Sequence, residues 1–427
     1  MTNLTKYQAK AQQLDEQDPL KAFRQYFSIP EGRLAPHKIY FCNNSLGLPP
    51  VKALTLMQDQ MQKWASQGVE GWFQGTDNWY ASLAASLQKP LAGLLGAQEE
   101  EVILMNSLTV NLHLLLVSFY RPTAKRCKIM IDSPTFPSDL YAIKSHLSFH
   151  GLKPEEALII MAPRPGESLL RMEDIQETIA KEGESIALVF LNPVNFLTGQ
   201  VLEMESIAKA VHEKGGLFGC DLAHAVGNIP LQLHAWEVDF AVGCSYKYLC
   251  AGPGGPGIAY VHASHHAEHL PRFSGWWGND PQSRFRMQLE PDFIPYGGAA
   301  SWQVSTPSVL ALTPLLASLE LFQEAGIARL REKSKLQTAF LLELLEELPK
   351  GQFHLLTPRH SNERGCQLTL RMPVVAEFFL GQLEEKEIIC DFRQPDMIRL
   401  APSPLYNTFS EIYACVSRLL DLLGDLQ

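Results

Sequence analysis

The segment LFGCDLAHAVGNIPLQLHAWEVDFAVGCSYK, Leu217–Lys247, contains two short apolar runs, and each leads to a residue that can carry charge. The first run ends at Asp221, which His224 follows by three residues, and the second run leads to Lys247. Runs of this kind are typical of strands that are buried on both faces of a parallel sheet. Because parallel strands end at the same edge of a sheet, the segment predicts that Asp221 and Lys247 lie near each other there.

Further apolar runs of the same kind lie on either side of this segment. They read VILMN, KIMID, ALIIM, IALVFL and IAYV, and most are separated by helical periodicity or by turn signals. Strands that alternate with helices predict an α/β fold, with a mainly parallel sheet covered by helices. After about residue 308, two long helical patterns precede the candidate strands CQLTLRM, EIICDF and MIRLAP and a closing helix. This second texture predicts a smaller α+β domain.

The chain is therefore expected to divide into three parts. Residues 1–50 form an N-terminal segment that packs on the small domain, and residues 5–29 within it look helical. Residues 51–305 form the large α/β domain, and residues 306–427 form the small α+β domain. No low-complexity linker separates the two domains, so we expect them to pack closely.

The composition excludes several classes of function. The 427 residues include 36 basic and 46 acidic side chains, for a formal charge of -10, and no long basic block could neutralise a nucleic-acid backbone. No apolar run approaches the roughly 20 residues that span a bilayer, and the N-terminus lacks a secretory pattern. The eight cysteines contain no C-x-x-C pair. These observations predict a cytoplasmic protein without nucleic-acid or membrane partners.

The residues at the strand ends suggest a specific chemistry. A lysine at a strand end beside an apolar wall can lose its proton near neutral pH and attack an aldehyde. A carboxylate at the depth of Asp221 needs a cationic partner, and the protonated ring nitrogen of a pyridine cofactor would be one. The alternatives are a solvent-exposed Lys247, a helix cap at Asp221 and a hydrogen-bonded core histidine at His224.

Two further strand ends carry candidate cofactor contacts. In FPSD, Phe136 offers an aromatic face for a planar ring and Asp139 offers a second carboxylate, although the same letters also start a helix. In NSLT, Ser107 and Thr109 stand at a helix start, where free N–H groups favour a phosphate. Helix caps of this kind are common in proteins without any ligand.

Two other motifs do not support a function. GPGGPG, residues 252–257, matches the dinucleotide pattern G-x-G-x-x-G, but it leads into the strand-like IAYV where that fingerprint requires a helix. HASHHAEH, residues 262–269, lacks cysteines and a metalloprotease spacing, so it indicates a solvated face and not a metal site. We therefore expect no metal.

Taken together, the strand-end motifs and several further sequence motifs resemble the kynureninase family of fold-type I pyridoxal phosphate (PLP) enzymes. The matching blocks are NSLTVNLHLLL, FPSDLYAI, TGQ, DLAHAVGN, CSYKYL, GWWG and RLAPSPLYNTF, and the resemblance runs from FCNNSLGL to the last helix. It implies an aspartate aminotransferase-like fold whose large domain binds PLP.

The resemblance also implies roles for individual residues. The catalytic residues would be Lys247, which bonds to the cofactor aldehyde, and Tyr246 beside it. The cofactor would contact Leu108, Thr109, Phe136, Asp139, Asn192, Asp221, His224, Tyr246, Lys247, Trp276 and Thr306. The substrate would contact Asn44, Ser45, Trp72, Thr306 and Arg399.

Some of these roles are specific. Arg399 would clamp the substrate carboxylate, a task suited to the guanidinium fork. Trp276 would reach the cofactor phosphate across the interface of a homodimer with shared active sites. Trp72 and Thr306 match the residues that bacterial members place at the aniline ring, which predicts a preference for L-kynurenine. Asn192 stands where some members have a small serine-like residue.

The reaction implied is hydrolytic β,γ-cleavage of L-kynurenine, and of its 3-hydroxy analogue, to the corresponding anthranilate and L-alanine in tryptophan catabolism. The alternative within the same fold is a cysteine desulfurase-like lyase. That reaction needs a reactive cysteine on a mobile loop, and Cys366, between an apparent turn and a strand, does not suit it.

Overall fold

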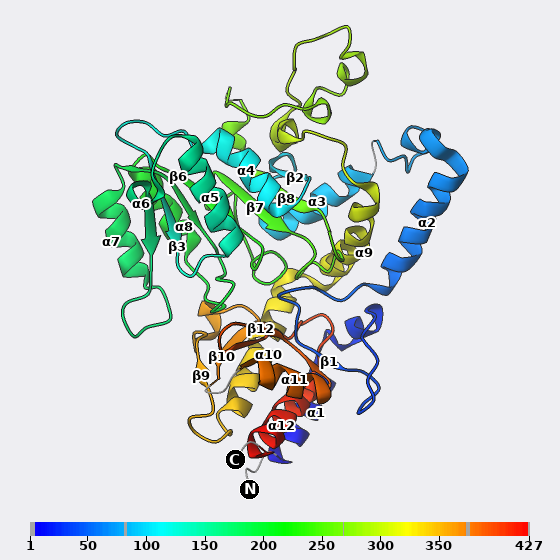
Figure 1. The fold of residues 1–427 in the computed structure, drawn as a ribbon. Helices are drawn as coiled ribbons and strands as arrows, with labels where there is room; N and C mark the ends of the chain where they lie inside the picture. Colours follow the sequence, from blue (N-terminus) through cyan, green and yellow to red (C-terminus); the bar gives the residue numbers. More distant parts are fainter. Residues whose placement is uncertain (1–4, 81–82, 268, 373–375, 426–427) are drawn as a thin grey trace.

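A seven-stranded sheet forms the centre of the larger part of the molecule (Figure 1). The computed structural model describes residues 5–80, 83–267, 269–372 and 376–425. The strands of this sheet are β2 (Val102–Leu104), β3 (Lys128–Asp132), β4 (Leu158–Met161), β5 (Ile186–Leu191), β6 (Leu217–Asp221), β7 (Phe240–Cys244) and β8 (Gly257–Val261). Their order is β2-β8-β7-β6-β5-β3-β4, and β8 is antiparallel to both of its neighbours. The predicted mainly parallel sheet is confirmed.

Helices cover both faces of the sheet, which explains why its strands are apolar throughout. On β5, Leu188 and Phe190 belong to a core shared with helices α4 and α5, whereas Val189 and Leu191 belong to a core shared with α7 and α8. This alternation is the two-residue period of a strand. The helices are α4 (Leu108–Phe119), α5 (Pro137–Phe149), α6 (Pro154–Ala157), α7 (Met172–Glu182) and α8 (Met204–Glu213).

Three further helices extend the second core beyond the sheet. They are α2 (Val51–Gln67), α3 (Leu83–Leu95) and α9 (Val309–Ala325), and α9 packs against both of the others. Leu312, Leu315 and Phe322 of α9 are buried in the core of the large sheet, although the expected domain boundary at residue 306 precedes this helix. Helix α9 ends at Gly326, whose φ of 75° is a conformation that glycine adopts without strain.

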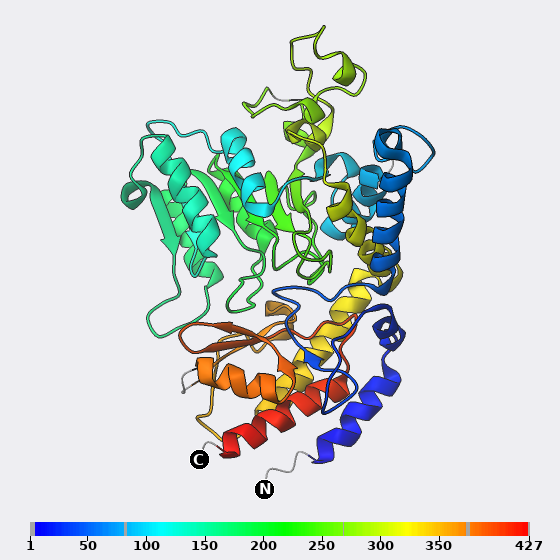
Figure 2. The ribbon, with the colours of Figure 1, turned by 45° about the vertical axis from the view of Figure 1, so that its right-hand side comes forward.

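The smaller part contains a second sheet, and both ends of the described chain lie there (Figure 2). This sheet has the order β12-β13-β10-β9 and is antiparallel. The elements of the smaller part are α10 (Ile327–Leu345), β9 (His354–Leu355), β10 (Leu368–Arg371), α11 (Ala376–Glu385), β11 (Ile388–Ile389), β12 (Asp391–Arg393), β13 (Met397–Leu400) and α12 (Phe409–Asp425). The predicted α+β character of this part is confirmed.

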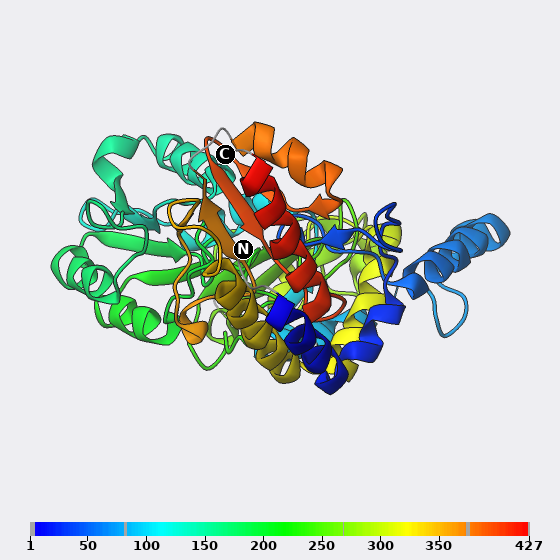
Figure 3. The same cartoon turned by 90° about the horizontal axis from the view of Figure 1, so that it is seen from below.

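The N-terminal segment packs on this smaller part. Helix α1 (Thr5–Gln17) lies beside α12, as the view from below shows (Figure 3), and β1 (Ile39–Tyr40) pairs in parallel with β11. The helix expected over residues 5–29 is broken near Pro19, because proline cannot continue the hydrogen-bond ladder. A separate 3-10 helix, η1 (Lys21–Tyr26), follows the break.

A long stretch between β8 and α9 rises away from the sheet at the top of Figure 1. It carries η5 (Trp276–Gly278), η6 (Arg284–Arg286) and η7 (Gly298–Trp302), and several of its large apolar side chains are exposed. The remaining 3-10 helices are η2 (Gly68–Trp72), η3 (Glu99–Glu101), η4 (Ala263–His265) and η8 (Ser361–Glu363). Across the part of the chain that the structure describes, no helix has the length and apolar character needed to cross a bilayer.

Candidate active site

Lys247 lies just beyond the end of β7, at the edge of the sheet where β6 ends in Asp221. Its side chain is half-buried and points inward, so the solvent-exposed alternative is wrong. Lys247 Nζ is 3.2 Å from His224 Nε2 and 5.6 Å from the centroid of the Phe136 ring. The Tyr246 ring centroid is 5.9 Å from the same amine. Sequence-distant residues predicted for one site are thus brought together around this amine.

Two buried carboxylates lie beside this group. Asp221 is buried, and its Oδ1 accepts a hydrogen bond of 2.8 Å from the Ala223 N–H. No helix follows it, because residues 222–229 form turns, so Asp221 is not a helix cap. Asp139, in the first turn of α5, is 0% exposed, and among the described residues no N–H or hydroxyl group donates to its carboxylate. It faces Asp221, and the two carboxyl groups can share a hydrogen bond when one of them carries a proton.

The electrostatics of this carboxylate pair are unfavourable without a further cation. Burial, and then the charge of Asp221, raise the pKa of Asp139 well above its usual range. Burial also raises the pKa of Asp221, and the hydrogen bond with Asp139 and then the nearby Lys247 charge oppose that rise. A protonated ring nitrogen bound here would compensate the negative charge of these two buried carboxyl groups.

His224 completes the inner part of the site. Burial, followed by the positive charge of Lys247, lowers the pKa of this imidazole well below its usual range. His224 is therefore neutral at physiological pH and can accept a hydrogen bond from the Lys247 amine. Its other ring nitrogen, Nδ1, is 3.4 Å from the Tyr248 hydroxyl, a neighbour that was not predicted from the sequence. We refer to Phe136, Asp139, Asp221, His224, Tyr246 and Lys247 as the Lys247 site.

The starts of two helices meet next to this site. Leu108 is the first residue of α4, and its N-cap Ser107 makes no side-chain capping hydrogen bond. Thr109 Oγ1 is 2.9 Å from Ser138 Oγ, which belongs to the first turn of α5. Free N–H groups and paired hydroxyls of this kind suit a phosphate. Ser138 was not singled out in the sequence, although it stands inside the FPSD motif.

Arg399 on β13 reaches toward the site from the smaller part of the molecule. Its guanidinium is fully buried, and its Nε and Nη2 lie 2.8 and 2.7 Å from Asp391 Oδ1. Its Nη1 donates to the carbonyl oxygen of Phe196 at 2.5 Å. The Phe196 ring in turn packs edge-on against Phe136, with centroids 5.5 Å apart. Phe196 and Asp391 were not predicted, because their roles depend on contacts between distant segments.

Asn44 and Ser45 lie in the turn after β1, close to the same segment. The Asn44 amide donates to Gln367 Oε1 at 2.8 Å, and its own Oδ1 is buried without a partner among the residues that the structure describes. Gln367 Nε2 donates to the Phe196 carbonyl oxygen at 3.1 Å. The half-buried Ser45 precedes Gly47, whose N–H donates to the Tyr246 carbonyl oxygen. The turn therefore contacts both the Phe196 segment and the segment of the catalytic candidates.

The side chain of Asn192 is engaged by a third buried carboxylate. Asn192 Nδ2 donates to Asp132 Oδ1 at 2.9 Å, and Asn195 Nδ2 donates to Asp132 Oδ2 at 3.1 Å. Burial raises the pKa of Asp132 to about 6, against the opposing effect of both amides. Asp132 ends the run KIMID as Asp221 ends LFGCD, so the same sequence signal could have identified it. These bonds orient the segment that carries Phe196.

Trp72, Trp276 and Thr306 lie apart from the Lys247 site. Trp72 packs against Trp79 and Trp277, and Trp276 packs against Trp277 and Phe285. Thr306 is half-buried between η7 and α9. Among the described residues, no ring contact or hydrogen bond joins any of the three predicted residues to Lys247.

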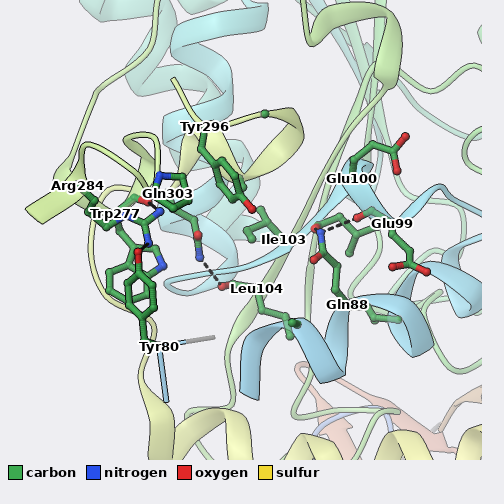
Figure 4. Close-up of a pocket in the computed structure, with 16 residues that line it drawn as sticks. Tyr80, Gln88, Glu99, Glu100, Ile103, Leu104, Trp277, Arg284, Tyr296 and Gln303 are labelled. Atoms are coloured by element: carbon green, nitrogen blue, oxygen red, sulfur yellow. Dashed lines mark hydrogen bonds between the residues drawn. The ribbon is translucent and has the colours of Figure 1, made fainter. Parts of the chain in front are cut away.

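Next to this aromatic cluster is a cavity of about 510 Å³. In Figure 4, Tyr80, Trp277 and Arg284 lie together on one side, and Glu99 and Glu100 lie on the other. The Arg284 guanidinium is 4.6 Å from the Trp277 ring centroid. None of the residues of the Lys247 site lines this cavity.

The histidine-rich segment 262–269 is less exposed than its sequence predicts. His265 is buried and lies 2.7 Å from Asp239 Oδ1, so the prediction of a solvated face is wrong for this residue. His262, His234 and Glu101 place possible ligand atoms within 4.8 Å of one another. Glu101 Oε1, however, already accepts the Ala263 N–H and faces His234 Nδ1, which describes a structural network.

Comparison with known proteins identifies the family. The chain is 48% identical to the kynureninase of Myxococcus xanthus (strain DK1622) over 412 residues, which cover 96% of each chain. It is 43% identical to the Mus musculus kynureninase, with 97% of this chain and 92% of the mouse protein covered. The chain belongs to the kynureninase family. The family model described as "Kynureninase C-terminal domain" matches residues 330–419, within the smaller part of this kynureninase family member.

Solved structures with the same fold support the fold-type I assignment. A cysteine desulfurase from Thermococcus onnurineus NA1 superposes with a TM-score of 0.75 at 17% identity, covering 97% of this chain and 98% of that chain. A mutant of the lyase C-DES, with glycine covalently linked to its PLP cofactor, has a TM-score of 0.76 at 22% identity, covering 90% and 96%. These similarities extend to the fold alone.

The desulfurase-like alternative lacks its nucleophile at the expected place. Cys366, the cysteine between a turn and a strand, is 1% exposed, and burial raises the pKa of its thiol to about 12. A reactive cysteine requires an accessible thiolate, which burial disfavours. The buried Cys366 thiol does not support a desulfurase activity, and the relatives of the chain are kynureninases.

Proposed function

We propose that this protein is a PLP-dependent kynureninase that cleaves the β,γ carbon–carbon bond of L-kynurenine with water, and so forms anthranilate and L-alanine. The observation that carries the proposal is the pair of buried carboxyl groups, Asp139 and Asp221, next to the Lys247 amine. Such a pair is costly unless a bound cation completes it. The family membership described above supplies the reaction.

The residues present fit the cofactor. Asp221, supported by Asp139 and His224, would pair with the protonated ring nitrogen, and Phe136 would stack on the ring. The phosphate would lie at the start of α4, against the N–H groups and hydroxyls of Leu108, Thr109 and Ser138. When bound, PLP joins covalently to an amine and draws electrons from the adjacent carbon, which makes protons on the substrate acidic.

The chain itself supplies the movement of protons. Neutral His224 can accept a hydrogen bond from the Lys247 Nζ atom and so holds that amine in position. Burial raises the pKa of Tyr246 above its usual range, and the neighbouring Cys244 adds to the rise. Tyr246 therefore keeps its phenolic proton at neutral pH and acts as a proton donor. Lys247 accepts and returns protons at the substrate carbons that it faces.

The substrate is held by residues from the smaller part of the molecule. Arg399 is the proposed partner of the substrate carboxylate, which then competes with Asp391 for the guanidinium. Asn44 has one unpartnered buried oxygen that can accept a hydrogen bond from the substrate. Trp72 and Thr306 are proposed to line the aniline ring and to favour L-kynurenine over its 3-hydroxy analogue.

A homodimer with shared active sites is part of the proposal. Trp72 and Trp276 belong to an aromatic cluster that makes no contact with the Lys247 site in the described residues of the same chain. Phe273, Phe285 and Leu289 of the projecting stretch are exposed, as expected of a surface that a second copy covers. We place this dimer in the cytoplasm.

The decisive experiment follows the cofactor and the product. The purified protein should show a visible absorbance that borohydride fixes to Lys247, and it should release fluorescent anthranilate from L-kynurenine. Parallel assays with the 3-hydroxy analogue measure the substrate preference. Release of sulfur and alanine from cysteine, without anthranilate, would instead indicate a desulfurase.

The first prediction concerns Lys247→Ala. This variant should fold normally, because Lys247 is half-buried at a pocket and not in a core, but it should lose turnover and the visible absorbance. The matched control is Lys153→Ala, because Lys153 is exposed and pairs only with Glu156 at the surface. Full activity of Lys247→Ala, or an insoluble protein, would contradict the assignment.

A further inference from the structure

A second cavity, of about 660 Å³, lies where the smaller part of the molecule joins the larger one. One side is formed by the segments 201–206 and 229–230 and by Trp236. The other side is formed by Arg331 and Lys335 of α10 and by Asn362. None of the residues of the Lys247 site lines it, and its volume lies within the usual range of small-molecule sites.

The charge balance of this cavity is unusual at Arg331. This residue is 7% exposed, and its Nη2 donates only to the carbonyl oxygens of Ser361 and Arg364, at 2.8 and 2.7 Å. Its Nη1 is buried and has no hydrogen-bond partner among the described residues. A buried guanidinium without an anion is costly.

Lys333, two residues from Arg331 on α10, is a buried cation that does have an anionic partner. Lys333 is 5% exposed, close to the burial of Arg331, and its Nζ lies 2.7 Å from Asp18 Oδ2. Within the described chain, no ion pair of this kind involves Arg331. The chain therefore supplies an anion for one buried cation of α10 and leaves the other without one.

The remaining charges of the cavity do not supply that anion. Glu203 and Glu205 also line the cavity, but both are exposed to solvent, whereas Arg331 is buried. Lys335 pairs with Glu332, and Lys209 is exposed. The start of α8 at Met204 also faces the cavity, and the partial positive charge of a helix N-terminus favours an anion.

The walls of the cavity are apolar. Val201, Leu202, Ile229, Pro230 and Trp236 line it beside the charged groups. Apolar walls with one buried cation match a ligand that has an apolar or aromatic body and a single negative group. An inorganic anion would leave these walls unfilled.

We propose that this cavity binds a small organic carboxylate with an aromatic or aliphatic body, and that its carboxylate pairs with Arg331. The site is separate from the Lys247 site and does not depend on the proposed reaction. Because its two sides come from the two parts of the molecule, the bound ligand contacts both of them.

The test is a ¹⁹F NMR titration of the PLP-loaded protein with 4-fluorobenzoate. We expect saturable binding to the wild-type protein, weakened by about tenfold or more in Arg331→Gln, because a buried charge-assisted pair is lost. In Val201→Trp, the guanidinium stays but the larger side chain fills the cavity, so binding should be lost there too. This second variant separates loss of the site from a general effect of removing Arg331.

Two control variants locate the binding. Arg359→Gln removes an exposed arginine that lies outside the cavity, and Arg399→Gln removes the arginine proposed for the substrate. Both should bind 4-fluorobenzoate as the wild type does. Absence of binding to the wild type, equal binding to all variants, or loss of binding in Arg399→Gln alone would overturn the proposal.

Discussion

Asp139 shows how one residue can lower stability in order to serve a site. Its carboxylate is fully buried, receives no hydrogen bond from an N–H or hydroxyl group among the described residues, and lies beside the carboxylate of Asp221. Because its pKa is raised in the folded protein, the folded state holds this proton more tightly than the unfolded chain does. The resulting loss of stability develops as the pH rises above the usual aspartate range, and it is complete above the raised pKa.

Asp139→Asn should therefore stabilise the cofactor-free protein while it impairs the enzyme. At pH 8 we expect the free energy of unfolding to rise by about 1 kcal/mol or more, and turnover to fall by about tenfold or more, because the ring nitrogen is less well matched. Urea unfolding and anthranilate release measure the two effects. Glu155→Gln, at an exposed position, is the control, and a destabilised but fully active Asp139→Asn would contradict the role given to this carboxylate.

His146 provides a pH-dependent prediction away from the site. Burial, and then the neighbouring His113 and His150, lower the pKa of this imidazole from 6.5 to about 4. The unfolded chain therefore binds a proton below about pH 6.5, which the folded protein binds only near pH 4. Stability is lost as the pH falls through that window, by up to about 3 kcal/mol.

His146→Phe should remove this loss, because phenylalanine does not titrate and can stack on His113 as the imidazole does. The measurement is the free energy of unfolding at pH 7 and pH 4.5 for both proteins. His360→Phe, at an exposed position, should keep the wild-type pH dependence. Identical pH dependence in His146→Phe and the wild type would rule out this residue as the cause.

At the level of single residues, the sequence pattern predicted which side chains lie together at the candidate site but not their contacts. Asp221, Lys247, His224 and Phe136 were found because polar or aromatic residues directly follow apolar runs. Phe196, by contrast, is joined to the site through the carbonyl oxygen that accepts from Arg399, and a backbone carbonyl leaves no trace in a residue pattern.

At the level of secondary structure, an aspartate from one helix caps another that is far away in sequence. Asp15 of α1 accepts hydrogen bonds from the N–H groups of Phe409 and Ser410, at 2.6 and 3.0 Å, in the first turn of α12. These groups have no partners within α12 itself. The bonds fix the N-terminal segment to the smaller part of the molecule.

Asp15→Ala should lower the free energy of unfolding by about 1 to 2 kcal/mol, because two N–H groups lose their acceptor and the helix dipole loses a favourable charge. Asp15→Asn should recover part of this loss. Urea unfolding of the PLP-loaded protein is the measurement, with Glu16→Ala, next to Asp15 but exposed, as the control. Equal stability of Asp15→Ala and the control would show that the cap is unimportant.

The strands and helices themselves were largely predictable. All seven strands of the large sheet fall on apolar runs identified in the sequence, and α9, α10 and α12 fall on leucine-rich helical patterns. The two-residue strand β9 was not predicted, because so short an element has no measurable periodicity. The expected boundary at residue 306 placed α9 with the small domain, whereas its apolar side chains lie in the core of the large sheet. Periodicity reveals an apolar face but not the surface that covers it.

At the level of the whole molecule, the proposed dimer gives a complementation test. Lys247→Ala has an intact Trp276, and Trp276→Ala has an intact Lys247. In a mixed dimer, one of the two sites combines both functional residues if the sites are shared between subunits. Each variant alone should be impaired.

Unfolding and refolding an equal mixture of the two variants should restore about a quarter of the wild-type activity, because half of the dimers are mixed and each has one intact site. Anthranilate release before and after refolding is the measurement. Refolding each variant separately is the control. No recovery in the mixture, although mixed dimers form, would place Trp276 in the same site as Lys247 of its own chain.

The backbone carbonyl of Phe196 also links substrate binding at Arg399 to the contact between the larger and smaller parts of the molecule. It belongs to the larger part, yet it holds Arg399 and Gln367 of the smaller part, while its ring rests on Phe136. A substrate that moves the Arg399 side chain must therefore alter the hydrogen bond between Arg399 and Phe196, which joins the smaller part to the larger part. Binding free energies at two coupled sites are reciprocal. A ligand that binds better when the two parts are apart will therefore weaken substrate affinity by the same factor by which substrate weakens the binding of that ligand.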